Sequence, residues 1–93
     1  MDAATAHRWG LVNRLVPAGE AVAASLALAG RIAANAPLSV AMSKRIITES
    51  PDWPAEGIWD HQRPLVDAVV NSRDAQEGAR AFAEKRAPVW QGQ

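Results

Sequence analysis

Apolar side chains recur every third or fourth residue along much of this 93-residue chain, which is the spacing of one face of an α-helix. The clearest repeat lies between residues 20 and 35, where it consists of Val22, Leu26, Ala29 and Ala33. Alanine fills about a fifth of the sequence, and it favours helix because its side chain loses no entropy there. We therefore expect a mostly α-helical chain.

Capping residues and prolines divide this pattern into separate helices. Asp2 can cap a short helix that Gly10 ends, because glycine readily adopts the left-handed turn that follows a helix. Pro37 suits the first turn of another helix, which should reach Ser50 and stop at Pro51. These signals predict helices over residues 2–9, about 20–35 and 37–50.

A further helix is expected to begin near Asp52, which can cap it ahead of Pro54. Its inward face would consist of Ile58, Gln62, Leu65 and Val69. Pro64 lies inside this pattern, and we expect it to kink or divide the helix because proline removes a backbone donor and clashes with the preceding turn.

The last predicted helix begins after Ser72, a good capping residue, and ends near Arg86. Pro88 prevents it from continuing. The residues after it, 89–93, are expected to fray. The side chains expected to point inward from this helix are Ala75, Ala79 and Phe82.

One stretch suits a different backbone. Residues 11–16 mix β-branched and apolar side chains and stop at Pro17, which fits either a short strand or an extended loop. A single strand would need a hydrogen-bonding neighbour from another chain or from further sequence, because buried backbone groups require partners. The fold prediction is therefore mostly α, with at most one short strand near residues 11–16.

The length fits one small domain or one piece of a larger fold, so residues 1–93 are treated as a single helical segment. A lone chain of this size removes only about 60 to 65 % of its unfolded surface from water. Partner surfaces are therefore expected to cover part of it.

Charge, cysteine content and the lengths of apolar runs exclude several classes of protein. Ten basic and ten acidic side chains leave no net charge, which argues against a dedicated nucleic-acid binder. The absence of cysteine excludes disulfides, thiolate catalysis and cysteine-bound zinc. The apolar runs are too short to span a membrane, and Asp2, His7 and Arg8 interrupt the region where a signal peptide would be apolar. A cytoplasmic location is expected.

The titratable residues do not form a complete active site. His7 and His61 lie on different predicted elements, so no metal site is expected. Asp74 and Glu77 have helical spacing and could transfer protons if one were buried, but both lie at a helix start, where they complement the helix dipole. The pair of Asp52 with Glu56 is interpreted in the same way. No catalytic residue is expected in this chain.

Two features leave alternatives open. Four tryptophans are many for a chain of this size, and Trp53 and Trp59 can lie either at a partner interface or in ordinary packing. Lys85 and Arg86 close the last helix, where they either complement its dipole or face an anionic ligand.

Three motifs, in order, resemble the enoyl-CoA hydratase/isomerase (crotonase) family. They are AATAHRWGLVNRLVP at residues 3–17, IAANAPLSVAMSK at residues 32–44 and SRDAQEGARAFAEKRAP at residues 72–88. The resemblance covers essentially the whole chain but only the C-terminal third of the family fold. It implies the helical trimerisation segment of a crotonase, and it would make residues 11–16 the last strand of a sheet formed elsewhere.

The family resemblance implies a function in acyl-CoA chemistry, most naturally enoyl-CoA hydration, with the catalytic groups outside this segment. It assigns CoA binding to Phe82 and Lys85, with Arg86 and Lys44 as weaker candidates. It also implies a homo-oligomer, a trimer or hexamer in the parent enzyme, or association with a crotonase core. Expected partners are the CoA thioester substrate and no nucleic acid or membrane, with no tightly bound cofactor. The alternative is a stand-alone helical protein-protein interaction module without CoA chemistry.

Overall fold

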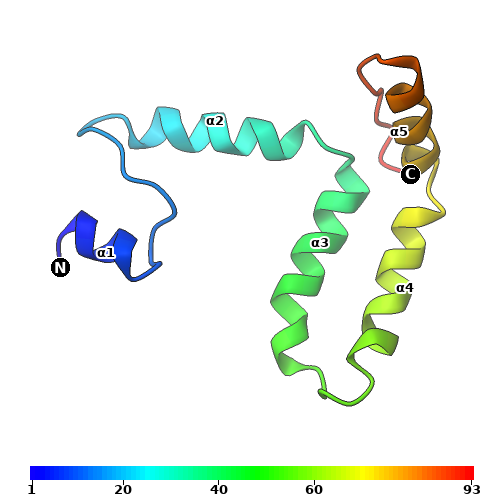
Figure 1. The fold of residues 1–93 in the computed structure, drawn as a ribbon, viewed down its shortest axis with the longest axis horizontal. Coiled ribbons are helices and arrows are strands. Elements are labelled where there is room, and N and C mark those ends of the chain that lie inside the picture. The colour runs from blue at the N-terminus through cyan, green and yellow to red at the C-terminus, as the bar shows by residue number, and fades with distance from the viewer. The chain divides into compact units, whose positions relative to one another are not determined.

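The computed structural model describes the whole chain, residues 1–93, and contains helices but no strand, as expected for a mostly α chain. Figure 1 shows the order of the elements along the chain. They are α1 (Ala3–Arg8), α2 (Ala21–Ala33), α3 (Pro37–Glu49), the 3-10 helix η1 (Ser50–Asp52), α4 (Ile58–Val70) and α5 (Arg73–Glu84). The chain forms two compact units, Met1–Arg31 and Ile32–Gln93, which are described separately.

In the first unit, α1 begins and ends at the residues that the sequence predicts. The Asp2 carboxylate accepts a hydrogen bond from the backbone N–H of Thr5 at 2.7 Å, which caps the helix and lowers the pKa of Asp2. Gly10 follows the helix with a φ of 77°, a conformation that glycine adopts without steric cost. Both local signals are therefore confirmed.

Residues 11–16 form an extended loop, which is one of the two alternatives that the sequence left open. Its first residue, Leu11, donates its backbone N–H to the carbonyl of Ala6 at 2.9 Å. The Nδ1 atom of His7 lies 3.1 Å from the carbonyl oxygen of Val12. These contacts attach the start of the loop to α1, whereas the later residues, Leu15 and Val16, expose much of their apolar side chains.

In the second unit, α3 and α4 run side by side and are joined by η1 and a short loop (Figure 1). Pro37 occupies the first turn of α3, as predicted. The predicted start of the next helix near Asp52 is wrong, because Asp52 ends η1 and α4 begins after Gly57, whose φ is 79°. Pro64 does not divide α4, since its missing N–H removes only one hydrogen bond from a helix that continues on both sides.

Helix α5 begins as predicted but has a different inward face. The hydroxyl of Ser72 accepts a hydrogen bond from the backbone N–H of Ala75 at 3.0 Å. The buried residues of α5 are Asp74 and Ala81, each 1 % exposed, whereas Phe82 is 77 % exposed and Ala79 is also exposed. The predicted face is therefore wrong, because the chain end packs against the side of the helix that carries Asp74 and Ala81.

Few side chains are buried in either unit. The first unit contains no buried residue, and the second contains three, Ser72, Asp74 and Ala81. The exposed large apolar side chains include Trp9, Leu11, Val22, Leu26, Ile47, Trp59, Val70, Phe82 and Val89. The predicted stripe of α2 is exposed, whereas the predicted inward face of α4 is half-buried at each of its positions, Ile58, Gln62, Leu65 and Val69.

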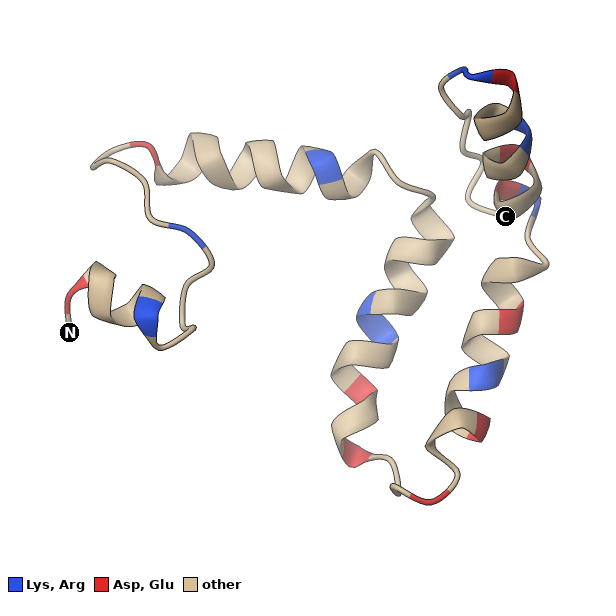
Figure 2. Ribbon diagram, in the orientation of Figure 1, with Lys and Arg blue, Asp and Glu red and all other residues tan.

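The charged residues are concentrated on the later helices. Figure 2 shows acidic and basic residues interspersed along α3, α4 and α5, whereas Arg31 is the single charged residue of α2. No single helix has the length and apolar composition needed to cross a membrane. One pair of helical segments, Ala21–Ala33 and Pro37–Asp52, reaches that length and apolar composition when taken together, with a break between the two.

Candidate functional site

The chain end, residues 89–93, lies along α5 and is bonded to a buried carboxylate. The two oxygens of Asp74 accept hydrogen bonds from the backbone N–H groups of Gln91 at 2.7 Å and Gly92 at 2.8 Å. The backbone N–H of Asp74 donates in turn to the carbonyl of Gln93 at 3.0 Å. We call residues 89–93 the C-terminal strap. The prediction that these residues fray is wrong, because their backbone groups are paired with α5.

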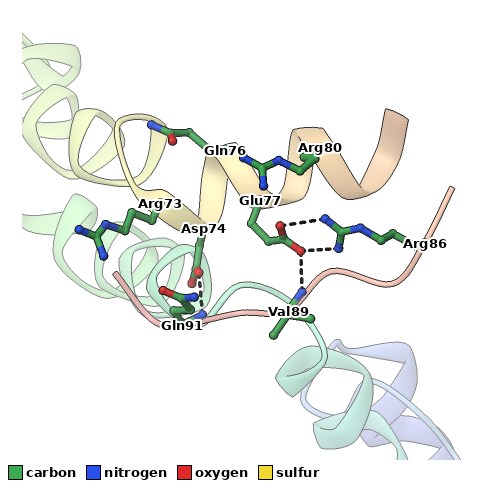
Figure 3. A pocket seen from close by; sticks show the side chains of 8 residues that line it. All are labelled: Arg73, Asp74, Gln76, Glu77, Arg80, Arg86, Val89 and Gln91. Atoms are coloured by element: carbon green, nitrogen blue, oxygen red, sulfur yellow. Dashed lines mark hydrogen bonds and ion pairs between the residues drawn. The ribbon is translucent and has the colours of Figure 1, made fainter. Parts of the chain in front are cut away.

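A second carboxylate, that of Glu77, attaches the start of the strap. It accepts two hydrogen bonds from the guanidinium of Arg86, at 2.6 and 3.0 Å, and one from the backbone N–H of Val89 at 2.9 Å (Figure 3). The Nε of Arg86 also donates to Glu84 at 2.6 Å. These bonds, chiefly those from Arg86 and then that from Val89, lower the pKa of Glu77 to about 2.

Trp90 connects the strap to the start of α3. A β-carbon added at Gly78 would lie 3.3 Å from the Trp90 ring, so glycine allows the indole to lie close to the α5 backbone. The indole N–H donates to the carbonyl oxygen of Ala34 at 2.8 Å. Trp90 therefore links α5 to the segment between α2 and α3.

Helix α5 ends in a Schellman motif at Lys85, which has a φ of 56° and a ψ of 37°. The N–H of Lys85 donates to the carbonyl of Phe82, and the N–H of Arg86 donates to that of Ala81. This turn places the Lys85 ammonium 4.4 Å from the centre of the Phe82 ring, a cation–π contact. The two residues assigned to CoA are thus neighbours on an exposed end of the helix.

The two weaker candidates differ in their surroundings. Arg86 is engaged by Glu77 and Glu84, so its guanidinium neutralises carboxylates of its own chain. Lys44 lies on α3 beside an open hollow lined by apolar side chains, among them Ile32 and Ile47.

The strap and α5 enclose one side of an open hollow of about 510 Å³. Figure 3 shows how its lining side chains lie; they are Arg73, Asp74, Gln76, Glu77, Arg80, Arg86, Val89 and Gln91. The two carboxylates of this hollow, Asp74 and Glu77, already accept hydrogen bonds from the strap and Arg86. They act as structural acceptors here, a role that adds to their complementing the helix dipole.

The strap was not predicted, although the sequence contains two signals for it. Gly78 lies inside the predicted helix, where glycine lowers helix stability and no turn requires its backbone freedom. Trp90 is a large aromatic in a tail otherwise expected to be solvated. Together they indicate a close contact between helix and tail.

The histidines and the remaining tryptophans lie apart from this site. His61 stacks on Trp53, with ring centroids 5.7 Å apart and an interplanar angle of 24°. Trp59 is 72 % exposed. No group of three or more His, Asp or Glu side chains is arranged to hold a metal ion.

Comparisons with known proteins match the entire chain. A family model described as Enoyl-CoA hydratase/isomerase matches residues 1–93. The carnitinyl-CoA dehydratase of Salmonella typhi is 42 % identical over 96 residues, covering 99 % of this chain and 37 % of the relative.

Solved structures agree with this match. An enoyl-CoA hydratase from Mycobacterium tuberculosis H37Rv superposes with a TM-score of 0.97 at 47 % identity, covering 100 % of this chain and 37 % of that one. A probable enoyl-CoA hydratase/isomerase from Mycobacterium abscessus gives a TM-score of 0.93 at 49 % identity, with the same coverage. The chain therefore spans little more than a third of the length of these relatives, and the part it matches is their C-terminal part.

Proposed function

Since the chain belongs to the enoyl-CoA hydratase/isomerase family, we propose that it is the C-terminal segment of an enzyme that acts on acyl-CoA thioesters, with enoyl-CoA hydration as the activity. The observation that carries this proposal is the match over residues 1–93 to a hydratase structure, at a TM-score of 0.97 and 47 % identity. A match over the whole chain favours acyl-CoA chemistry over a stand-alone interaction module.

Within that enzyme, Phe82 and Lys85 would bind the nucleotide part of the CoA thioester. An exposed ammonium can make charge-assisted hydrogen bonds to phosphate oxygens, and the exposed ring beside it can receive the flat face of an adenine. The 4.4 Å separation of ammonium and ring allows one ligand to contact both. These two residues would supply binding and orientation, without a part in proton transfer.

The groups that move protons would lie in the rest of the parent enzyme. Hydration of an enoyl thioester needs donors for the developing enolate oxygen and a carboxylate that exchanges protons with water and carbon. The carboxylates of Asp74 and Glu77 accept hydrogen bonds from the strap and Arg86, which gives both groups a structural role in this segment. This supports a role in binding and assembly.

The assembly role is supported by the exposed apolar side chains. In the first unit no side chain is buried, and Leu11, Val22 and Leu26 are among those exposed. Burial of such side chains against a partner surface stabilises an assembly by about 25 cal/mol per Å² of apolar surface. The helices would thus contact the rest of the parent enzyme and neighbouring subunits.

The proposed function is tested by recovering the natural reading frame that contains this segment and assaying its product. We expect the parent enzyme to hydrate crotonyl-CoA, followed as loss of the ultraviolet absorbance of the enoyl thioester. A stop codon directly before Met1, with no neighbouring gene that could supply a crotonase core, would instead favour the interaction module.

A further inference from the structure

Lys85 has an uncommon backbone conformation. It is the only residue other than glycine with a positive φ in residues 1–93, at 56°. At the position after a helix where the chain turns left-handed, glycine is preferred because a β-carbon crowds the following carbonyl. A non-glycine residue persists there when its surroundings hold it, and such positions gather where a side chain has a function.

The residues on both sides of Lys85 are held by hydrogen bonds. Its neighbours in sequence, Glu84 and Arg86, are bonded to each other at 2.6 Å. Arg86 is also held by Glu77 through two parallel hydrogen bonds, and Glu77 is held by the N–H of Val89 in the strap. We call Glu77, Glu84 and Arg86 the carboxylate clamp. It fixes the chain immediately before and after Lys85.

The clamp also sets the charge around the Lys85 ammonium. Arg86 pairs with both Glu77 and Glu84, so that one positive charge is held between two negative charges and partly neutralises them. Without Arg86, these carboxylates would attract the ammonium away from the Phe82 ring and repel an anionic ligand. With it, the ammonium stays 4.4 Å from the ring centre.

We propose that Glu77 and Arg86 are positioning residues for CoA recognition, which hold Lys85 in its left-handed turn with its ammonium beside Phe82. This inference rests on the proposed function, because it assumes that Lys85 contacts the phosphates of a CoA thioester. The pair touches no ligand itself. It lowers the conformational entropy that Lys85 would otherwise lose when the ligand binds.

The test compares two substrates in the parent enzyme. One is an acyl-CoA, and the other is the same acyl group on pantetheine, which lacks the nucleotide and its phosphates. We expect Glu77→Gln and Arg86→Gln to raise KM for the acyl-CoA about three- to tenfold, as for a weakened charged contact, with kcat unchanged. Both constants for the pantetheine thioester should stay at their wild-type values.

A double variant identifies the residue through which the pair acts. If Glu77 acts through Lys85, the double variant Glu77→Gln with Lys85→Ala should bind the acyl-CoA no more weakly than Lys85→Ala alone. Arg86→Lys keeps the charge without the two parallel hydrogen bonds, and its KM should lie between those of wild type and Arg86→Gln. The matched control is Arg45→Gln, which removes an exposed ion pair with Glu49 of 2.7 Å on α3. It should leave both substrates unaffected.

The outcomes distinguish failure of the positioning proposal from failure of the proposed CoA contact. If Lys85→Ala leaves acyl-CoA binding unchanged, the proposed CoA contact itself is wrong. If Lys85→Ala weakens binding and Glu77→Gln does not, the positioning inference alone is overturned. It is also overturned if the clamp variants impair both thioesters equally, because that pattern indicates general loss of structure. Should Arg86→Gln fail to assemble, Glu77→Gln and Arg86→Lys give the same comparison.

Discussion

Two carboxylates on α5 hold the C-terminal strap, and they differ in their burial and in their hydrogen-bond donors. Asp74 is almost fully buried and accepts two backbone N–H groups, from Gln91 and Gly92. Glu77 lies nearer the surface and combines one backbone N–H, that of Val89, with the guanidinium of Arg86. The bonds to Glu77 include a charged partner, and they should respond to pH because they lower the pKa of this carboxyl group.

The attachment of the strap to Glu77 is expected to weaken in acid. Its pKa is lowered from 4.5 to about 2 by Arg86 and Val89, so its stabilising effect is complete above pH 4.5 and is lost as the pH falls to 2. The amide proton shift of Val89, followed by NMR in the folded chain, should titrate with a midpoint near the lowered pKa of about 2, and Glu77→Gln should abolish the titration. A midpoint at the ordinary glutamate value would contradict the assigned bonds.

Lys85 is expected to contribute directly to binding. Replacing it with alanine in the parent enzyme should weaken binding of a CoA thioester by about 1 to 2 kcal/mol, as expected for a lost hydrogen bond to a charged group. Isothermal titration with a non-hydrolysable acyl-CoA analogue measures the change. Arg63→Ala, which removes an exposed cation from α4, serves as the comparison and should leave the affinity unchanged. An unchanged affinity for Lys85→Ala would return this residue to a role in complementing the helix dipole.

The residue types alone did not decide the role of Lys85. The chemistry of Lys85 permits either a helix-dipole role or an anion contact, and the family resemblance was needed to assign it together with Phe82. What the residue types did not reveal is the left-handed turn that brings the ammonium and ring to 4.4 Å. We propose that this turn is held by the bonds of Arg86 to Glu77, nine residues earlier in the chain.

The helix ends that depend on nearby side chains were predicted correctly from the sequence. Asp2 and Ser72 cap their helices with bonds to residues three positions later, and Pro37 begins α3. The inward face of α5 and the ordered conformation of the strap could not be predicted from the sequence. They depend on the hydrogen bond between Asp74 and Gln91, which are seventeen positions apart. A contact of that kind leaves no periodic signal in either segment.

Two helical glycines should respond differently to the same substitution. Gly30 in α2 has open space around it, so Gly30→Ala should raise helix content, since alanine favours helix over glycine by about 0.5 to 1 kcal/mol. Gly78→Ala should gain less, because its new β-carbon would lie 3.3 Å from the Trp90 ring. Far-ultraviolet circular dichroism of the two variants gives the comparison. An equal gain at both positions would show that the Trp90 contact does not restrict α5.

For the molecule as a whole, the scarcity of buried apolar side chains predicts weak independent folding. Ala81 is the one apolar residue that is buried, although the sequence is 48 % hydrophobic. The isolated chain should therefore unfold over a broad temperature range and should associate with itself. Calorimetry and sedimentation would test this expectation. A compact monomer with one sharp transition would show that the chain is self-sufficient.

We propose that this segment binds and assembles while the proton-transfer groups lie elsewhere in the parent enzyme. A hydration assay of the purified 93-residue chain with crotonyl-CoA, repeated after a second independent purification, tests this proposal. We expect no turnover above the uncatalysed rate, with hydration present in the parent enzyme assayed alongside. Turnover by the isolated chain that persists through repurification would contradict it.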